Sequence, residues 1–327
     1  MNKYILKLNI LIVLINLIII INFLLKCFKN IDISFNITKF KLFYNEKFAI
    51  IQRNVTISTS GLMAYYFNNI GCAIDYIYNG YIPIIDLSSH PNIFNAFNKT
   101  SFTNPWEIFF NQPFGYKLEN IIKYAKNKKY VQCNIPSHSP NTNIFTNMIL
   151  INYWHNIANI YFPIKQYLVK EANLKFKNLF HNSNNVLGIL IRGTDYIAMK
   201  PKYHPIQPSP NMVIKDIIKM DTENRYDWFF ITTEDDLIRE KFIKKFGNKL
   251  KYIKILININ YDYNKKIRLG FNRYIKGNID YYKIYVINII ILSKCLDIIS
   301  SITSGSIVAF ILSNGFRNKI VYNLGTY

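Results

Sequence analysis

The sequence predicts an α/β protein with a doubly wound parallel sheet, preceded by one N-terminal transmembrane helix. Three observations support this prediction. Short apolar runs alternate with helix-length segments through the second half of the chain, as in parallel sheets. Polar loops follow three of these runs. An almost unbroken run of Ile, Leu and Val extends from Leu8 to Leu25, close to the ~20 residues that a spanning helix needs.

The N-terminal run is interpreted as an uncleaved signal anchor over residues 1–30. Lysines stand on both sides of it, and no small-residue cleavage site follows. Residues 31–55 are interpreted as a stem leading to the globular part. We therefore expect a single-pass membrane protein, of type II in the Golgi or endoplasmic reticulum if eukaryotic or viral, and in the inner membrane if bacterial.

The globular part begins with a breaker-rich turn at Ser58–Gly61, a helix over 62–79 and a buried strand over 81–87. This order is typical of half a doubly wound unit. The second half predicts strands at 186–191, 227–233, 250–257, 296–300 and 319–323, with helices at 209–220, 235–246, 281–294 and 304–314. Such alternation predicts a parallel sheet covered by helices on both faces.

The composition excludes several classes of protein. There are 40 Lys and Arg against 19 Asp and Glu, a net charge of +21, but the lysines are scattered in the manner of a solvated surface. No arginine-rich arm or zinc-finger spacing is present, so nucleic acid is not an expected partner. The four cysteines show no metal-binding spacing. A Cys72–Cys133 disulfide is conceivable, although buried free thiols are the favoured interpretation.

Three loops at predicted strand ends carry the residues that could perform chemistry. Arg192 follows the first strand, and the guanidinium of an arginine can bind a phosphate through two parallel hydrogen bonds. The carboxylates of Glu234 and Asp235 follow the second strand and could bind a ribose or a base amine. The turn Thr303–Ser306 opens a helix, where hydroxyl and backbone N–H groups bind anions. Each loop alone is more typical of a structural turn or helix cap than of a binding site, but together they predict a nucleotide-diphosphate site.

Motifs of competing enzyme classes are absent from the sequence. There is no G-x-x-x-x-G-K-[ST] loop, no G-x-G-x-x-G after a strand and no G-x-S-x-G elbow. An NTPase, a dehydrogenase and a hydrolase are therefore not indicated. No D-x-D motif, the usual metal-holding device of the other large glycosyltransferase fold, follows a predicted strand.

Several segments together resemble a known family. Residues 188–195 resemble a strand ending in His-x-Arg-Arg-x-Asp, residues 203–206 resemble Phe-His-Pro-Ile, and residues 230–235 resemble a strand ending in Thr-Asp-Asp. Residues 302–310 resemble a serine-rich third motif. Residues 60–86 are similar to the glycine turn, helix and strand that open an acceptor domain. These motifs, over most of residues 56–327, resemble the GDP-fucose-dependent fucosyltransferases, most closely the α-1,6-fucosyltransferases, including rhizobial nodulation enzymes, and small bacterial polysaccharide enzymes.

The resemblance implies a GT-B-type architecture of two Rossmann-like domains, with an acceptor-side domain at 56–180 and a nucleotide-sugar-binding domain at 181–327. It implies a metal-independent, inverting glycosyltransferase that moves fucose from GDP-fucose, or a sugar from another nucleotide donor, to a glycan or glycolipid acceptor. Neither a cofactor nor a metal is expected. By position, Arg192 would hold the diphosphate, Glu234 and Asp235 would contact the guanine or ribose, and phosphate would be bound by Thr303, Ser304 and Ser306.

Three positions depart from the family's pattern. Leu190 replaces the histidine of the first motif, and Gly193 replaces its second arginine. Lys200 stands where the family has a glutamate proposed as the acceptor base, and an ammonium cannot act as a carboxylate. Asp195 and His204 are the remaining candidates for the base. A donor other than GDP-fucose and a non-catalytic relative are the alternatives that these departures leave open.

Overall fold

The structure is a computed structural model that describes residues 46–52, 61–88, 104–133, 136, 138–193, 196–197, 200, 202–254 and 279–327. The chain divides into two compact units. One consists of residues 1–46 with 124–127, and the other of residues 47–123 with 128–327. The second unit contains the strands and helices that form the candidate site.

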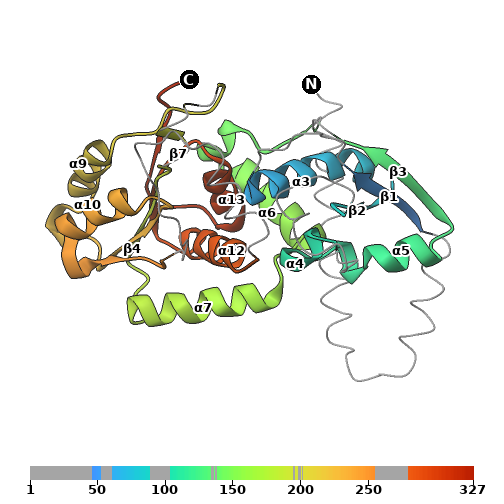
Figure 1. The fold of residues 1–327 in the computed structure, drawn as a ribbon, viewed down its shortest axis with the longest axis horizontal. Helices are drawn as coiled ribbons and strands as arrows, with labels where there is room; N and C mark the ends of the chain where they lie inside the picture. The colour runs from blue at the N-terminus through green and yellow to red at the C-terminus, as the bar shows by residue number, and fades with distance from the viewer. Residues whose placement is uncertain are drawn as a thin grey trace, which may run out of the picture. The chain divides into compact units, whose positions relative to one another are not determined.

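A five-stranded parallel sheet organises the second half of the chain (Figure 1). Its strand order is β6-β5-β4-β7-β8, and every printed pairing is parallel. The strands are β4 (Val186–Leu190), β5 (Trp228–Thr232), β6 (Leu250–Lys251), β7 (Asp297–Ser301) and β8 (Lys319–Tyr322). All residues of β4 and β7 are buried, as expected for central strands covered on both faces.

Helices pack on both faces of this sheet. Alternate residues of β4, such as Leu187 and Ile189, share one apolar cluster with α9 (Pro210–Met220) and α10 (Asp236–Phe246). Leu190 of the same strand belongs to the other cluster. That cluster includes residues of α7 (Gln166–Phe180), α12 (Ile279–Ser293) and α13 (Ser304–Leu312). The predicted doubly wound sheet is therefore confirmed.

The strand order reverses beside β4. The chain runs from β4 outward through β5 to β6, and then returns to place β7 on the other side of β4. At such a switch point the two connections leave in opposite directions and open a crevice at the carboxyl ends of the strands. The loops that follow β4 and β7 lie at this place.

A smaller sheet has the order β2-β1-β3. Its strands are β1 (Lys47–Gln52), β2 (Ile82–Ile85) and β3 (Asn127–Gln132), with β1 and β2 parallel. Helix α3 (Leu62–Tyr78) connects β1 to β2 and packs against α13. The other helices in this half of the chain are α4 (Trp106–Phe109), α5 (Leu118–Tyr124) and α6 (Met148–Tyr161). Short 3-10 turns occur here at Pro113–Gly115 and Thr142–Phe145, and in the second half at Thr222–Asn224 and Gly247–Lys249.

Most elements lie within one to two residues of their predicted ends. Helix α9 begins as expected with Pro210 in its first turn, where Ser209 caps it by accepting a hydrogen bond from the Met212 N–H at 3.2 Å. Two predictions differ from the structure. Strand β1 falls inside the range 31–55 interpreted as a stem, and β6 ends at Lys251, although the sequence predicts a strand through residue 257.

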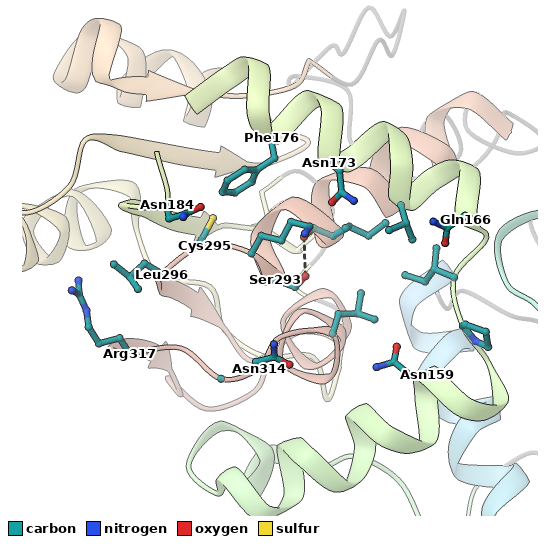
Figure 2. A pocket seen from close by; sticks show the side chains of 17 residues that line it. Asn159, Gln166, Asn173, Phe176, Asn184, Ser293, Cys295, Leu296, Asn314 and Arg317 are labelled. Atoms are coloured by element: carbon teal, nitrogen blue, oxygen red, sulfur yellow. Dashed lines mark hydrogen bonds between the residues drawn. The ribbon is translucent and has the colours of Figure 1, made fainter. Parts of the chain in front are cut away.

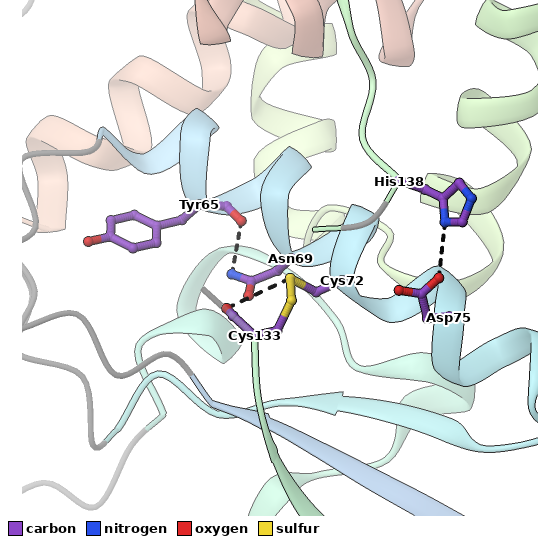
Figure 3. Close-up of a disulfide and its surroundings, with 6 residues drawn as sticks. All are labelled: Tyr65, Asn69, Cys72, Asp75, Cys133 and His138. Carbon is purple, nitrogen blue, oxygen red and sulfur yellow. Dashed lines mark hydrogen bonds and ion pairs between the residues drawn. A yellow bond between two sulfur atoms is a disulfide. The ribbon is translucent and has the colours of Figure 1, made fainter. Parts of the chain in front are cut away.

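A disulfide joins Cys72 of α3 to Cys133, which directly follows β3 (Figure 3). The two Cα atoms are 6.1 Å apart, within the range that a disulfide spans. The expectation of buried free thiols is therefore wrong for this pair, because the fold brings together two cysteines that are 61 residues apart. It is confirmed for Cys295, a buried free thiol whose pKa is raised by burial.

The predicted anchor over residues 1–30 lies outside the described residues. Within the described ranges, no helix has both the length and the apolar character needed to cross a bilayer.

Candidate active site

The three polar loops predicted from the sequence meet at one edge of the larger sheet. Leu190 at the end of β4 is in register with Thr232 of β5 on one side and with Ser300 of β7 on the other. Because the three strands are parallel, their carboxyl ends reach the same edge. Arg192, Glu234 and the turn at Thr303 each begin two to three residues beyond these paired positions. The predicted convergence of the loops is thus a property of the sheet register.

Arg192 is held at this edge by the loop after β5. Its Nε lies 3.2 Å from Oε1 of Glu234, and the side chains are 24% and 7% exposed. The same carboxylate oxygen accepts a hydrogen bond from the Gly193 N–H at 2.9 Å. The guanidinium also lies over the ring of Tyr196, with its carbon 4.9 Å from the ring centroid. Glu234 therefore fixes the position of the arginine.

Asp235 has a structural role in this arrangement. Its Oδ1 accepts hydrogen bonds from the N–H groups of Leu237 and Ile238 at 2.9 and 3.1 Å, so that it caps α10, and it is 4% exposed. A Cβ at Gly193 would lie 2.8 Å from Cγ of Asp235. The Asp235 side chain fills the space that a side chain at position 193 would need. This explains why glycine stands here in place of the second arginine of the resembling motif.

The third loop is a capped helix start. Oγ1 of Thr303 accepts a hydrogen bond from the Ser306 N–H at 3.2 Å, and the Ser306 hydroxyl donates to the Ser301 carbonyl oxygen at 2.5 Å. Ser306 is fully buried. The side chains of Thr303 and Ser306 therefore stabilise the turn itself. Since Thr303 engages the N–H of Ser306, the groups that remain for an anion are the partly exposed Ser304 hydroxyl and the N–H groups of Ser304 and Gly305, which have no partner inside the helix.

Tyr285 of α12 links the arginine to this helix start. Its hydroxyl interacts with the charged guanidinium of Arg192. It would lie 2.9 Å from a Cβ placed on Gly305, in the first turn of α13. Burial raises the pKa of Tyr285 to about 12, and the charge of Arg192 opposes that shift. The sequence analysis missed Tyr285, since nothing in the pattern separates it from the other tyrosines among the 25 in the chain.

Of the two candidate bases, only His204 lies among the described residues, because Asp195 falls outside them. The imidazole of His204 is exposed and packs edge-on against Tyr196, with ring centroids 5.5 Å apart. Its Nδ1 donates to the Lys202 carbonyl oxygen at 3.2 Å, so in the neutral ring Nε2 is left as the proton acceptor. Tyr196 thus lies against both His204 and Arg192. Lys200, at the position of the family's glutamate, is exposed.

A cavity of about 870 Å³ lies at the opposite edge of the larger sheet (Figure 2). Its lining includes Asn184, Leu296 and Arg317, which precede β4, β7 and β8. The remaining polar lining is mainly carboxamide, from Asn159, Gln166, Asn173 and Asn314. None of the predicted site residues lines this cavity. It is therefore separate from the site at the carboxyl edge.

The fold is α/β, and Arg192 and the capped start of α13 lie at the carboxyl edge of its larger sheet, beside a strand-order switch. A comparison with protein-family models gives no match, and a sequence comparison with curated proteins gives none. In structure the chain is similar to fucosyltransferase NodZ from Bradyrhizobium, with a TM-score of 0.50 and 11% identity over 82% of this chain and 93% of that chain. The chain thus has the fold of this fucosyltransferase.

Weaker similarities were found to two further structures. One is NodZ α-1,6-fucosyltransferase soaked with GDP-fucose, with a TM-score of 0.46, 12% identity and coverage of 82% of this chain and 93% of that chain. The other is a mutant of Arabidopsis thaliana FUT1 in complex with GDP, with a TM-score of 0.45, 10% identity and coverage of 87% and 73%.

Proposed function

We propose that the chain is a glycosyltransferase that transfers fucose from GDP-fucose to a hydroxyl group of a glycan or glycolipid. The observation that carries the proposal is the position of Arg192 at the carboxyl edge of β4, beside the first turn of α13 and the strand-order switch. A cation and free helix N–H groups facing one crevice suit a diphosphate. The fold shared with a fucosyltransferase and the motif resemblance favour GDP-fucose among nucleotide sugars.

In the proposed reaction the acceptor hydroxyl oxygen attacks the anomeric carbon of the sugar. The bond from that carbon to the β-phosphate oxygen breaks, GDP leaves with the bonding electrons, and the hydroxyl proton passes to a base. Arg192 and the start of α13 would stabilise the charge that develops on GDP, which requires no metal ion. Among the described residues, His204 Nε2 is our candidate for the base. Asp195 stays a second candidate.

The larger sheet would belong to the donor domain, 181–327, of a GT-B arrangement. Strands β2 and β3 of the smaller sheet would belong to the acceptor-side domain, 56–180, which β1 would extend to residue 47. Glu234 would act mainly by orienting Arg192, since its carboxylate is already engaged. We also propose that residues 1–30 anchor the chain in a membrane. A disulfide in the globular part supports an oxidising compartment for it.

Binding of nucleotides to the full chain tests the proposal. A ligand that binds only the folded state raises its melting temperature by mass action. We expect GDP to stabilise the chain, with UDP, CMP and ADP giving little or no shift, and GDP-fucose to be turned over with an acceptor. Stabilisation by UDP alone would identify another nucleotide sugar as the donor. Stabilisation by GDP without turnover would instead identify a non-catalytic relative, for which the replacements at Leu190, Gly193 and Lys200 are the specific argument.

A further inference from the structure

Tyr285 occupies the space between the two anion-binding elements of the candidate site. It comes from α12, a helix with an otherwise largely apolar, buried C-terminal half. Its hydroxyl meets Arg192 on one side and the first turn of α13 on the other. A polar group placed between a guanidinium and a helix N-terminus lies where a bound diphosphate would be.

Gly305 permits this approach. A Cβ at this position would lie 2.9 Å from the Tyr285 hydroxyl oxygen and 3.3 Å from Cδ2 of Leu190. The first of these distances is shorter than real Cβ contacts, and both neighbours belong to the packed interior around β4 and α12. A residue with a side chain would therefore separate the hydroxyl from the helix start.

The hydroxyl of Tyr285 has a hydrogen left to donate. A guanidinium has only donors, so toward Arg192 the tyrosine oxygen can only accept, and its own hydrogen is not used there. Within the described part of the chain, the Tyr285 hydroxyl has no hydrogen-bond acceptor of its own. With a pKa of about 12, raised by burial, the hydroxyl keeps its hydrogen at neutral pH.

We propose that Tyr285 donates this hydrogen to an oxygen of the donor's diphosphate, alongside Arg192 and the N–H groups that open α13. The proposal rests on the proposed function and adds a contact that the family motifs do not include. An anion bound between the guanidinium and the helix start would supply the acceptor for this hydrogen. The same contact would strengthen as charge develops on the leaving GDP.

Tyr285→Phe removes the hydroxyl and keeps the ring. The matched control is Tyr226→Phe, because Tyr226 donates to the buried carboxylate of Asp297 at 2.5 Å, at the amino end of β7. Calorimetric titration of the full chain with GDP and with guanosine, which lacks phosphates, measures the effect. A hydrogen bond to a charged group is worth about 1.5–3 kcal/mol, so Tyr285→Phe should raise the Kd for GDP roughly 10- to 100-fold. The Kd for guanosine should stay unchanged.

The control separates binding from folding. Tyr226→Phe should lower the melting temperature and leave both Kd values unchanged. Equal losses for GDP and guanosine in Tyr285→Phe would overturn the proposal, as would unchanged GDP binding in a chain whose wild type binds GDP. Absence of GDP binding by the wild type would overturn the proposed function, and this inference with it. In an Arg192→Lys background the Tyr285→Phe loss should persist; if it vanishes, Tyr285 acts only by holding the arginine.

Discussion

The ion pair between Arg192 and Glu234 predicts how the folded state responds to the loss of either charge. The two atoms are 3.2 Å apart, and the glutamate side chain is 7% exposed. At that distance two unit charges attract by about 5 kcal/mol at an effective dielectric constant near 20. Desolvation of the pair offsets part of this attraction, and exposed pairs contribute below ~1 kcal/mol. We therefore expect a coupling energy of about 1–3 kcal/mol.

A double-mutant cycle measures this coupling. Glu234→Gln keeps an oxygen that can accept from the Gly193 N–H, so that the variant removes mainly the charge. Arg192→Ala leaves the glutamate charge without this partner and should lower the free energy of unfolding most. The double variant should be clearly more stable than the sum of the single losses predicts. Urea unfolding of the four chains gives the energies, and losses that add to within ~0.5 kcal/mol would refute an energetically important pair.

Two further predictions concern stability. Replacing Cys72 and Cys133 by serine should lower the free energy of unfolding by about 4 kcal/mol, the loop-entropy estimate for a separation of 61 residues, and an unchanged urea midpoint would contradict it. Burial alone raises the pKa of Asp297, but hydrogen bonds from Arg317, Tyr226 and Asn318 outweigh it and hold the pKa below its usual value. Its contribution is therefore present above the unfolded pKa of about 3.9 and is lost as the pH falls through the lower folded value. Asp297→Asn should melt at a lower temperature at pH 7 and lose less stability on acidification than the wild type; parallel melting curves against pH would argue against this.

The sequence was sufficient to predict the larger sheet and the edge to which the three polar loops belong. Its central strands β4 and β7 are fully buried and have apolar centres, and polar loops follow β4, β5 and β7. Parallel strands bring their carboxyl ends to one edge of a sheet. Because Arg192 and Thr303 each follow a predicted parallel strand, they could be predicted to lie at the same edge. The start of α9, with Pro210 in its first turn, could also be predicted, since this signal is local.

Contacts between residues distant in the chain could not be predicted from the sequence. The pairing of Glu234 with Arg192, the approach of Tyr285 to Gly305 and the Cys72–Cys133 disulfide all depend on the packing of separate elements. Short polar segments are a second difficulty, because a residue that caps a helix looks the same in sequence as one that binds a ligand. Asp235 and Ser306, both predicted to contact the nucleotide, have their side-chain oxygens engaged inside their own loops.

Strand β1 was missed for a third reason. It is a single apolar run, Phe48–Ile51, that follows a long Asn- and Lys-rich segment, and it lies in the range interpreted as a stem. Only its parallel pairing with β2 through helix α3 makes it a strand of a βαβ unit. Pairing of this kind depends on residues some 30 positions further along the chain.

The affinity of the Arg192→Ala variant for GDP tests the central claim most directly. Two charge-assisted hydrogen bonds of about 1.5–3 kcal/mol each predict a Kd for GDP at least roughly 100-fold higher than in the wild type. Arg225→Ala, which removes an exposed arginine before β5, should bind GDP as the wild type does. If Arg192→Ala binds GDP as tightly as the wild type, no diphosphate lies at this edge of the sheet.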